Sequence, residues 1–371
     1  MKVLPSRHKN IAVALSGGVD SAVAALILKE QGYSVTGVFM DCWQENADCE
    51  TDQERRSALQ VATSLDIPFK VFDLRQQYRQ KVLQYFFETY RAGQTPNPDI
   101  LCNKEIKFGL FLEKALQELD VDTIATGHYA RNQYQDGSYH LLRGIDENKD
   151  QSYFLYTLKQ EQLAQVLFPI GGMAKKKVRQ KAKRAGLPNW DKPDSQGICF
   201  VGKIRLFDFL HRQIPEKKGN VVNLEGKVIG HHRGAVFYTI GQRRGFSVNQ
   251  YQGVPQYVVS KDIKGNVLIV GERKDVFRQE LKANQLTWIR DRPLLGKCLV
   301  RIRHLGELIP AHLSQNNSGH TLNVKLAKTA FAIAPGQSAV FYQGEEVLGG
   351  GIIVYSPQTL LGKPLKLPQE T

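Results

Sequence analysis

A glycine-rich hexapeptide constrains the fold of this chain more than any other feature of its sequence. The hexapeptide, SGGVDS at 16–21, follows the apolar run 11–15 and leads into a helical pattern over 21–31 that Gly32 ends. Glycines permit turns that direct successive backbone N–H groups inward, and a following helix adds the positive end of its dipole. Because open α/β sheets bind ligands at the carboxyl ends of their strands, this loop predicts a phosphate cradle.

The first third of the chain alternates apolar and amphipathic segments of the lengths typical of α/β proteins. Buried strands are predicted at 11–15, 34–40, 69–74 and 122–128, and helices at 21–31, 52–65, 78–91 and about 103–119. Strands that alternate with helices in this way form βαβ units, so a doubly wound parallel sheet is expected.

The rest of the chain predicts further domains, since 371 residues exceed what one hydrophobic core usually supports. After a mixed, basic stretch over 140–200, short strands are expected at 236–241 and as a hairpin over 257–271. A second all-β pattern from about 280 is typical of a small barrel. We therefore expect an N-terminal α/β domain, a small mixed central domain and a C-terminal β-barrel, at 1–203, 204–278 and 279–371.

Charge and composition narrow the functional class. Lysine and arginine total 50 against 36 acidic residues, and the net charge of +14 favours a polyanionic partner such as nucleic acid. No apolar stretch approaches the ~18 residues of a membrane span, and the first ten residues lack the apolar core of a signal peptide. We therefore expect a cytoplasmic protein without a membrane partner. The basic run 174–184 fits either a solvated helix face or a contact with a phosphate backbone.

The cysteines and histidines predict neither a disulfide scaffold nor a metal site. The five cysteines are odd in number and contain no C-x-x-C pair, which is typical of a reducing compartment. The pair His231-His232 lacks partners at metal-binding spacing. Structural roles are expected for Cys42, Cys49 and Cys298.

The loop at 16–21 lacks the lysine with which a Walker loop assists transfer of a γ-phosphoryl group. We therefore expect it to hold the β and γ phosphates of ATP as a leaving unit while a nucleophile attacks the α phosphorus. The products would be an adenylated substrate and pyrophosphate. Asp20 and Ser21 are candidates to orient phosphate or Mg²⁺. A turn that serves packing alone is the alternative.

Two cysteines lie in loops suited to reactivity. Cys102, in TPNPDILCNKEIKF, precedes a helix expected to begin near Asn103, and the helix N-terminus with Lys104 and Lys107 should lower the pKa of its thiol. Cys199, in DSQGICFVG, lies in a polar, glycine-flanked turn. Taken alone, each is more often an inert cysteine.

Several motifs resemble known enzymes. SGGVDS after a first strand resembles the loop of the PP-loop ATPase superfamily (adenine nucleotide α-hydrolase-like), which includes GMP synthetase and several tRNA-modifying enzymes. TPNPDILCNKEIKF, ATGHYAR, LLRGIDENKDQSYFLYTL and DSQGICFVG, in this order, resemble the tRNA 2-thiouridylase family. With PGQSAVFYQGEEVLGGGII the resemblance extends from about residue 11 to 355.

The resemblance implies ATP-dependent 2-thiolation of the wobble uridine of tRNA. AMP would be transferred to the C2 oxygen, and Cys199, loaded with sulfur as a persulfide, would then replace that oxygen. Cys102 would be its catalytic partner and Asp99 would handle protons or position the base. Either a Cys102–Cys199 disulfide or free hydrosulfide would result. An iron–sulfur cluster on the same three residues is the family's alternative; the persulfide is favoured because no cysteine-rich spacing is present.

The resemblance also implies binding residues and partners. ATP, with Mg²⁺, would contact Ala14, Leu15, Ser16, Gly17, Gly18, Val19, Asp20, Ser21, Met40 and Gly127. The tRNA anticodon stem-loop would contact Asn97, Pro98, Asp99, His128, Lys149, Asp150, Gln151, Arg303, His304 and Gln337. Each of these tRNA contacts has a structural alternative. His128 could be a packed loop histidine, 149–151 could be only a polar loop, and Arg303 and Gln337 could belong to the barrel surface. A cysteine desulfurase or a sulfur-relay protein would supply the sulfur.

Three competing functions remain open at this stage. Another adenylating enzyme, such as an amide-forming ligase, would need no cysteines. The 4-thiouridine and 2-thiocytidine enzymes share the loop but carry other RNA-binding modules or C-x-x-C pairs. A non-catalytic ATP-sensing or RNA-binding protein is the third.

Overall fold

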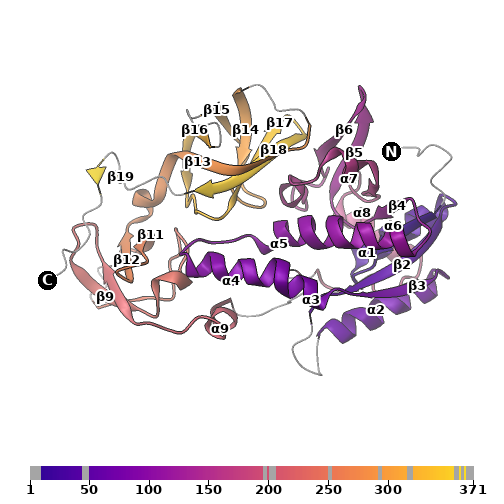
Figure 1. Cartoon of the computed structure of the whole chain (residues 1–371), viewed down its shortest axis with the longest axis horizontal. Coiled ribbons are helices and arrows are strands. Elements are labelled where there is room, and N and C mark those ends of the chain that lie inside the picture. The colour runs from indigo at the N-terminus through magenta and orange to yellow at the C-terminus, as the bar shows by residue number, and fades with distance from the viewer. Residues whose placement is uncertain are drawn as a thin grey trace.

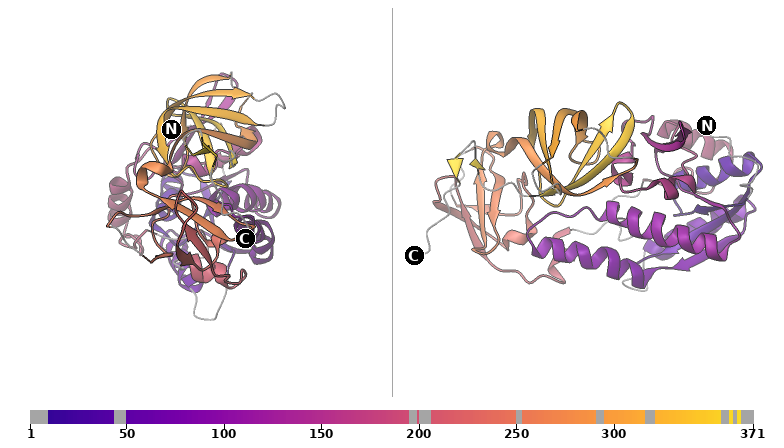
Figure 2. Two further views of the ribbon diagram at one scale, coloured as in Figure 1. Left: turned by 90° about the vertical axis from the view of Figure 1, so that its left-hand side faces the viewer. Right: turned by 45° about the horizontal axis from the view of Figure 1, so that its top comes forward.

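The computed structural model shows an elongated molecule built from an α/β part, a β-barrel and a small mixed part (Figures 1 and 2). Two long helical runs lie side by side and extend from the α/β part toward the mixed part, beneath the barrel. The described residues are 10–43, 50–194, 199, 206–249, 253–290, 295–315, 321–354, 359–360 and 363–364. Within them, no helix combines the length and the apolar character needed to cross a membrane.

The α/β part contains the predicted doubly wound parallel sheet, which is confirmed. Its strands follow the order β3-β2-β1-β4-β7, and every pair is parallel. The strands are β1 (Asn10–Ala14), β2 (Ser34–Asp41), β3 (Phe69–Asp73), β4 (Thr123–Ala125) and β7 (Val166–Leu167), with helices α1 (Val19–Glu30) and α2 (Glu50–Ser64). Chain order reverses between β1 and β4, and such a switch point opens a crevice at the carboxyl ends of the two strands.

The two long helical runs each contain a π-helical stretch. The first run comprises α3 (Arg75–Tyr78), η1 (Arg79–Leu83) and α4 (Gln84–Arg91), and the second comprises α5 (Pro98–Leu101), η2 (Cys102–Leu110) and α6 (Phe111–Glu118). The second run begins at Pro98, before the expected start near Asn103, because the Asn97 side chain accepts a hydrogen bond from Ile100 N at 3.3 Å. Cys102 therefore lies inside a helix.

The mixed part has a five-stranded sheet in the order β10-β9-β8-β12-β11. Its elements are α9 (Leu206–His211), β8 (Gly219–Val222), β9 (Val228–His232), η4 (Ala235–Phe237), β10 (Ser247–Val248), β11 (Tyr257–Asp262) and β12 (Val267–Gly271). The hairpin predicted over 257–271 is confirmed, but the strand predicted over 236–241 is wrong. Gly234 and Gly241 both adopt positive φ angles there and turn the backbone out of an extended path.

The C-terminal part is the predicted β-barrel. Six antiparallel strands close because β13 pairs with both β16 and β18. They are β13 (Phe277–Trp288), β14 (Gly296–Arg301), β15 (Ile309–Gln315), β16 (Leu322–Phe331), β17 (Ser338–Gln343) and β18 (Glu346–Val354), preceded by η5 (Arg273–Val276) and followed by β19 (Thr359–Leu360) and β20 (Lys363–Pro364). The hairpin of β5 (Ala130–Gln135) and β6 (Ser138–Arg143) joins this sheet where Leu142 pairs with Glu346.

A short segment connects that hairpin to the helix formed by the basic run 174–184. It contains η3 (Ser152–Leu155) and α7 (Gln160–Ala164), and α8 (Lys175–Arg184) then packs on α1. A buried ion pair fastens this segment to the barrel. Asp150, which is fully buried, contacts Arg301 of β14 at 2.7 Å and Arg143 at 3.3 Å, and its other oxygen accepts hydrogen bonds from Gly144 N and Ser152 N.

Replacing Asp150 with alanine should destabilise the fold. Asp150→Ala leaves the buried Arg301 without its partner, and breaking one side of a buried ion pair typically costs about 3–5 kcal/mol. Urea unfolding should show this loss. Glu147→Ala is the matched control, because Glu147 also contacts Arg143 but its side chain is 79% exposed. Equal stability of the two variants would contradict the structural role of Asp150.

Candidate functional site

The loop between β1 and α1 is held in one conformation by its own side chains. Ser21 Oγ accepts a hydrogen bond from Ser16 N at 3.2 Å and donates one to Gly18 O at 3.1 Å. Gly17 has a φ of +76°, and a Cβ there would lie 2.4 Å from the carbonyl oxygen of Glu54. Only glycine fits this position, so the backbone turn that presents the start of α1 is fixed.

The carboxyl end of β4 meets this loop closely. A Cβ at Gly127 would lie 2.6 Å from Ser21 N, so the two segments are in backbone contact. The other residues expected around ATP are buried: Met40 is 6% exposed, and the side chains of Ala14, Leu15 and Val19 also lie in the core. Because the side chains of these four residues are buried, the residues can contact a ligand only through their backbone atoms.

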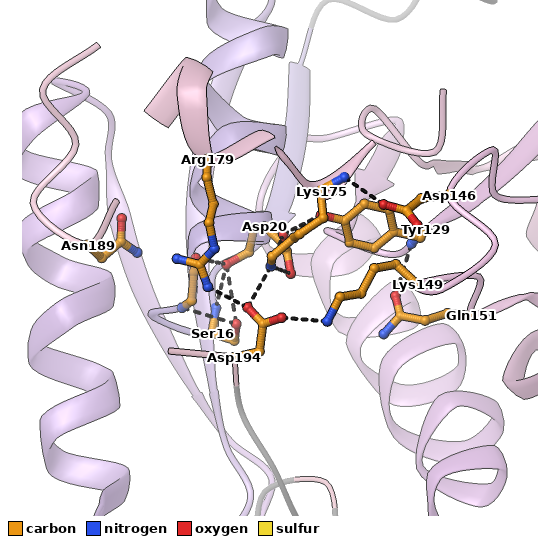
Figure 3. A network of polar contacts seen from close by, with 12 residues as sticks. Ser16, Asp20, Tyr129, Asp146, Lys149, Gln151, Lys175, Arg179, Asn189 and Asp194 are labelled. Atoms are coloured by element: carbon orange, nitrogen blue, oxygen red, sulfur yellow. Dashed lines mark hydrogen bonds and ion pairs between the residues drawn. The ribbon is translucent and has the colours of Figure 1, made fainter. Parts of the chain in front are cut away.

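Cations that sequence analysis did not assign to the loop surround it (Figure 3). Lys175 Nζ lies 2.7 Å from both carboxylate oxygens of Asp20 and 2.8 Å from Asp194. Arg179 and Lys149 contact the same Asp194 at 2.7 and 2.6 Å. The basic run 174–184 was the available signal, because Lys175 and Arg179 are four apart and share one helix face.

Three further side chains bind the same loop through the carbonyl oxygen of Gly17. Asn189 Nδ2 and Lys192 Nζ donate to the carbonyl oxygen of Gly17 at 3.0 and 3.3 Å. Ser57 Oγ donates to that oxygen as well, at 2.9 Å. We define the phosphate cradle as the loop 16–21 with Lys149, Lys175, Arg179 and Lys192.

Asp194 is an anion held by the cradle. Burial would raise the pKa of its carboxyl, but hydrogen bonds from Lys149 and Lys175 and the charges of these lysines hold the pKa well below its usual range. Three cations therefore converge on one ionised carboxylate beside a glycine-rich loop. This is the arrangement that binds phosphate oxygens.

The two cysteines singled out in the sequence lie together, and we call Cys102 and Cys199 the sulfur pair. Cys102 Sγ and Cys199 Sγ are 3.5 Å apart, although 97 positions separate them in the chain. The Cys199 backbone is held on both sides, because its N–H donates to Asp99 Oδ1 at 3.1 Å and its carbonyl oxygen accepts from Tyr78 Oη at 2.6 Å. Asp99 and Cys102 are three apart in one helical run and share a face.

The expectation that Cys102 has a lowered pKa is wrong. Burial, with the neighbouring Cys199, raises the pKa of the Cys102 thiol well above its usual value, and this residue is fully buried inside the helix. In Cys199 the pKa is lowered, first by the hydrogen bond from Cys102 and, against the effect of burial, also by Lys107. Of the two thiols, Cys199 therefore loses its proton more readily, and Cys102 is the hydrogen-bond donor of the pair.

His128 lies in the interior, beside the helix that carries Cys102. Its ring is 7% exposed, packs against Phe108 and Phe168, and bonds through Nδ1 to the Thr126 hydroxyl at 2.8 Å. Burial, with the charge of Lys107, lowers the pKa of His128 well below its usual range. The packed, neutral histidine that was the alternative for this position fits these contacts better than an RNA contact does.

Five other residues expected at tRNA lie where the barrel meets the segment that leads into α5, and we call this place the seam: Asn97, Pro98, Arg303, His304 and Gln337. Gln337 Nε2 donates to the carbonyl oxygens of Thr95 and Pro96 at 3.0 and 3.1 Å. The Asn97 side chain hydrogen-bonds Tyr153, and the neighbouring Phe154 ring packs 4.3 Å from the His304 ring. Pro98 starts α5 beside this seam.

The residues expected at tRNA differ in how far their side chains are exposed. Arg303 is exposed, and burial lowers the pKa of His304 to about 4. Gln151 accepts a hydrogen bond from Tyr129 N at 2.9 Å. Asp150 presents no surface to RNA, because it is fully buried between two arginines, and this expected contact is corrected to an internal one.

Metal binding at this site depends on how its acidic and sulfur side chains are arranged. Among the residues that the structure describes, no group of three or more His, Cys, Asp or Glu side chains has a geometry that could hold a metal ion. Two carboxylates, Asp20 and Asp194, face the cradle, and Mg²⁺ commonly binds through one or two carboxylates together with substrate phosphates.

Comparisons with known proteins cover nearly the whole chain. Family models described as tRNA methyl transferase HUP domain, tRNA methyl transferase PRC-barrel domain and Aminomethyltransferase beta-barrel domain match residues 9–203, 207–272 and 278–353. The tRNA-specific 2-thiouridylase MnmA of Idiomarina loihiensis is 44% identical, over 94% of this chain and 97% of that protein. Its namesake in Pasteurella multocida is 45% identical over 94% of each chain, and that of Enterococcus faecalis is 43% identical over 92% and 94%.

Mild oxidation should join Cys102 to Cys199. The sulfurs are 3.5 Å apart, so a disulfide of ~2.05 Å needs only a small approach, and the lowered pKa of Cys199 favours its reaction. Peptide mapping by mass spectrometry should find this pair linked before Cys298, which lies in β14 and whose pKa burial raises to about 12. Preferential oxidation of Cys298 would contradict the geometry.

Proposed function

The chain belongs to the tRNA-specific 2-thiouridylase family, and from that premise we propose that it catalyses ATP-dependent 2-thiolation of the wobble uridine of tRNA. It is a tRNA-modifying sulfurtransferase with a PP-loop fold. The observation that carries the proposal is that residues 127–128 contact both the loop 16–21 and the helix that carries Cys102. Gly127 contacts the loop 16–21, and His128, the next residue, packs against Phe108 of the helix that carries Cys102.

The cradle suits the first step, adenylation. Oxide is a very poor leaving group, so the C2 oxygen of uridine must be activated before sulfur can replace it. In our proposal this oxygen attacks the α phosphorus of ATP, the bond from that phosphorus to the bridging oxygen breaks, and pyrophosphate leaves. Lys149, Lys175, Arg179 and Lys192 would hold the leaving phosphates, which would take the place of the Asp194 carboxylate.

Magnesium fits this cradle as a companion of ATP. Asp20 would be its protein ligand, and Mg²⁺ would neutralise charge on the phosphates. Independently of the metal, Tyr129 donates a hydrogen bond to Asp20 at 2.7 Å, which fixes the direction of that carboxylate.

The sulfur pair suits the second step. The terminal sulfur of a Cys199 persulfide would attack C2, and AMP would leave with the former C2 oxygen. Cys102, after losing its proton, would attack Cys199 Sγ and break the S–S bond, which leaves the sulfur on C2 and forms a Cys102–Cys199 disulfide. A thiol reductant must then restore both cysteines. The separation of 3.5 Å supports this route, with release of hydrosulfide by Cys102 as its variant.

Asp99 is the candidate to manage protons at this site. Burial raises the pKa of its carboxyl, which makes it a better proton acceptor than an exposed aspartate. It shares a helix face with Cys102, whose thiol must lose a proton. The hydrogen bond that Asp99 accepts from Cys199 N also positions the second sulfur.

Binding of tRNA is proposed along the seam between the barrel and α5. Arg303, His304, Asn97 and Pro98 border it, and the net charge of +14 attracts the RNA backbone. A uridine edge reaches a buried sulfur only if the base leaves its stack. A cysteine desulfurase or a relay protein is the proposed sulfur donor, since the persulfide must come from outside the chain.

Separate loss of the two steps tests this function. With tRNA, ATP, cysteine and a cysteine desulfurase, Cys199→Ser should still release pyrophosphate but form no 2-thiouridine, whereas Asp20→Ala should do neither. Mass spectrometry of the nucleosides and a pyrophosphate assay measure the two outcomes, with Cys298→Ser as the matched cysteine control. If Cys199→Ser still placed sulfur on C2, the persulfide role would be wrong. Formation of an amide product that is unaltered in both cysteine variants, at 102 and 199, would favour an amide-forming ligase.

Removing the carboxylate from the cradle should tighten phosphate binding. Asp194→Asn frees Lys149, Lys175 and Arg179 from an internal anion, so the affinity for pyrophosphate without Mg²⁺ should rise about tenfold, which corresponds to ~1.4 kcal/mol. Isothermal titration calorimetry measures it. Asp191→Asn is the control, because Asp191 is exposed and has the same charge. Unchanged or weaker binding in Asp194→Asn would contradict the proposed competition.

A further inference from the structure

The π-helical stretch η2 changes which residues share a face with Cys102. In an α-helix, residues five apart are rotated by about 140° around the axis. A π-helix closes its hydrogen bonds between residues five apart, so such residues approach a common face. Cys102 opens η2, and the residue five positions further on is Lys107. The unusual helix therefore turns Lys107 toward the sulfur pair.

Lys107 contacts the sulfur of Cys199, which belongs to a different segment of the chain. Its side chain hydrogen-bonds the Cys199 sulfur. Burial acts to lower the pKa of Lys107, but attraction to Cys199, Cys102 and Asp99 raises it on balance, so the amine is protonated. A cation thus lies against the sulfur that receives and transfers the sulfane atom.

We propose that Lys107 is a fourth functional residue of the sulfur site, beside Asp99, Cys102 and Cys199. Its charge stabilises negative charge on Cys199, first on the thiolate that accepts sulfur and then on the persulfide anion. The second half of this role rests on the proposed function; the first does not. Cys102 donates a hydrogen bond to the same sulfur, so the anion is stabilised by a neutral donor and by one full charge.

The charged and titratable groups around Cys199 come from three elements. Asp99, Cys102 and Lys107 lie on the run from α5 through η2, Tyr78 ends α3, and Cys42 follows β2. Asp99 opposes ionisation of Cys199, and Tyr78 contacts the carbonyl oxygen rather than the sulfur. Lys107 supplies the positive charge among them, so its removal should change the titration of Cys199 in a known direction.

The pH dependence of Cys199 alkylation tests the proposal without tRNA, ATP or a sulfur donor. Iodoacetamide reacts with the thiolate, and mass spectrometry reports the rate at the Cys199 peptide alone. A lysine that lowers the pKa makes the thiolate present above a lower pH, so Lys107→Met should move the midpoint upward. We expect a shift of at least about one pH unit, which lowers the alkylation rate near pH 7 about tenfold.

Three further variants complete the experiment. Lys104→Met is the matched control, since Lys104 lies on the same helix, is 52% exposed and pairs with Glu105, so it should leave the midpoint in place. Lys107→Arg should keep the midpoint close to that of the unaltered protein, because it retains the positive charge. Asp99→Asn, which removes the opposing charge and keeps a hydrogen-bond acceptor, should move the midpoint downward and serves even if Lys107→Met does not fold.

Two results would overturn the proposal: an unchanged midpoint in Lys107→Met, or an equal shift in Lys104→Met. If Lys107→Met does not fold, an unchanged midpoint in Asp99→Asn would contradict the electrostatic account. Failure of the proposed thiolation would be recognised separately, because it leaves these midpoints as they are. The predicted shift together with an absence of 2-thiouridine would retain Lys107 as the partner of the thiolate and reject the wider reaction.

Discussion

The structure depends most on how the Cys199 backbone is fixed over the helix that carries Cys102. One hydrogen bond from its N–H to Asp99 and one to its carbonyl oxygen from Tyr78 determine where this residue lies. Each neutral bond contributes only ~1 kcal/mol net, and a bond to a charged group somewhat more, but together they set direction. Because both flanks of Cys199 are tied, its sulfur has the sulfur of Cys102 as a neighbour at 3.5 Å.

Charge divides the candidate site into two adjoining centres. The phosphate cradle gathers Lys149, Lys175 and Arg179 around one carboxylate, while at the sulfur site Lys107 lies against Cys199, whose pKa is lowered. His128 lies at the junction and is neutral, so it adds no further positive charge beside Lys107. The first centre suits a leaving pyrophosphate and the second suits a sulfur nucleophile. The proposed reaction requires both, one for adenylation and one for sulfur transfer.

Local sequence patterns predicted the parts of the site that short-range chemistry determines. The parallel strands and the SGGVDS loop followed from apolar periodicity and glycine placement, and β1, β2 and β3 lie within one or two residues of the expected bounds. The proximity of Cys102 to Cys199 came only from the family resemblance, because contacts across 97 positions leave no local pattern. The pKa of Cys102 was misjudged because the Asn97 cap, which starts the helix early, and the burial of the thiol both depend on tertiary structure. The same holds for Asp150, whose polar neighbours in sequence suggest a surface loop.

The central claim is that the C2 oxygen of uridine leaves as part of AMP, and isotope tracing tests it most directly. A tRNA substrate labelled with ¹⁸O at C2 of the wobble uridine should be thiolated with ATP and a persulfide donor, and the nucleotide product examined by mass spectrometry. The account predicts one ¹⁸O atom in the phosphate of AMP for each 2-thiouridine formed. Label recovered in water or in orthophosphate, with unlabelled AMP, would contradict it.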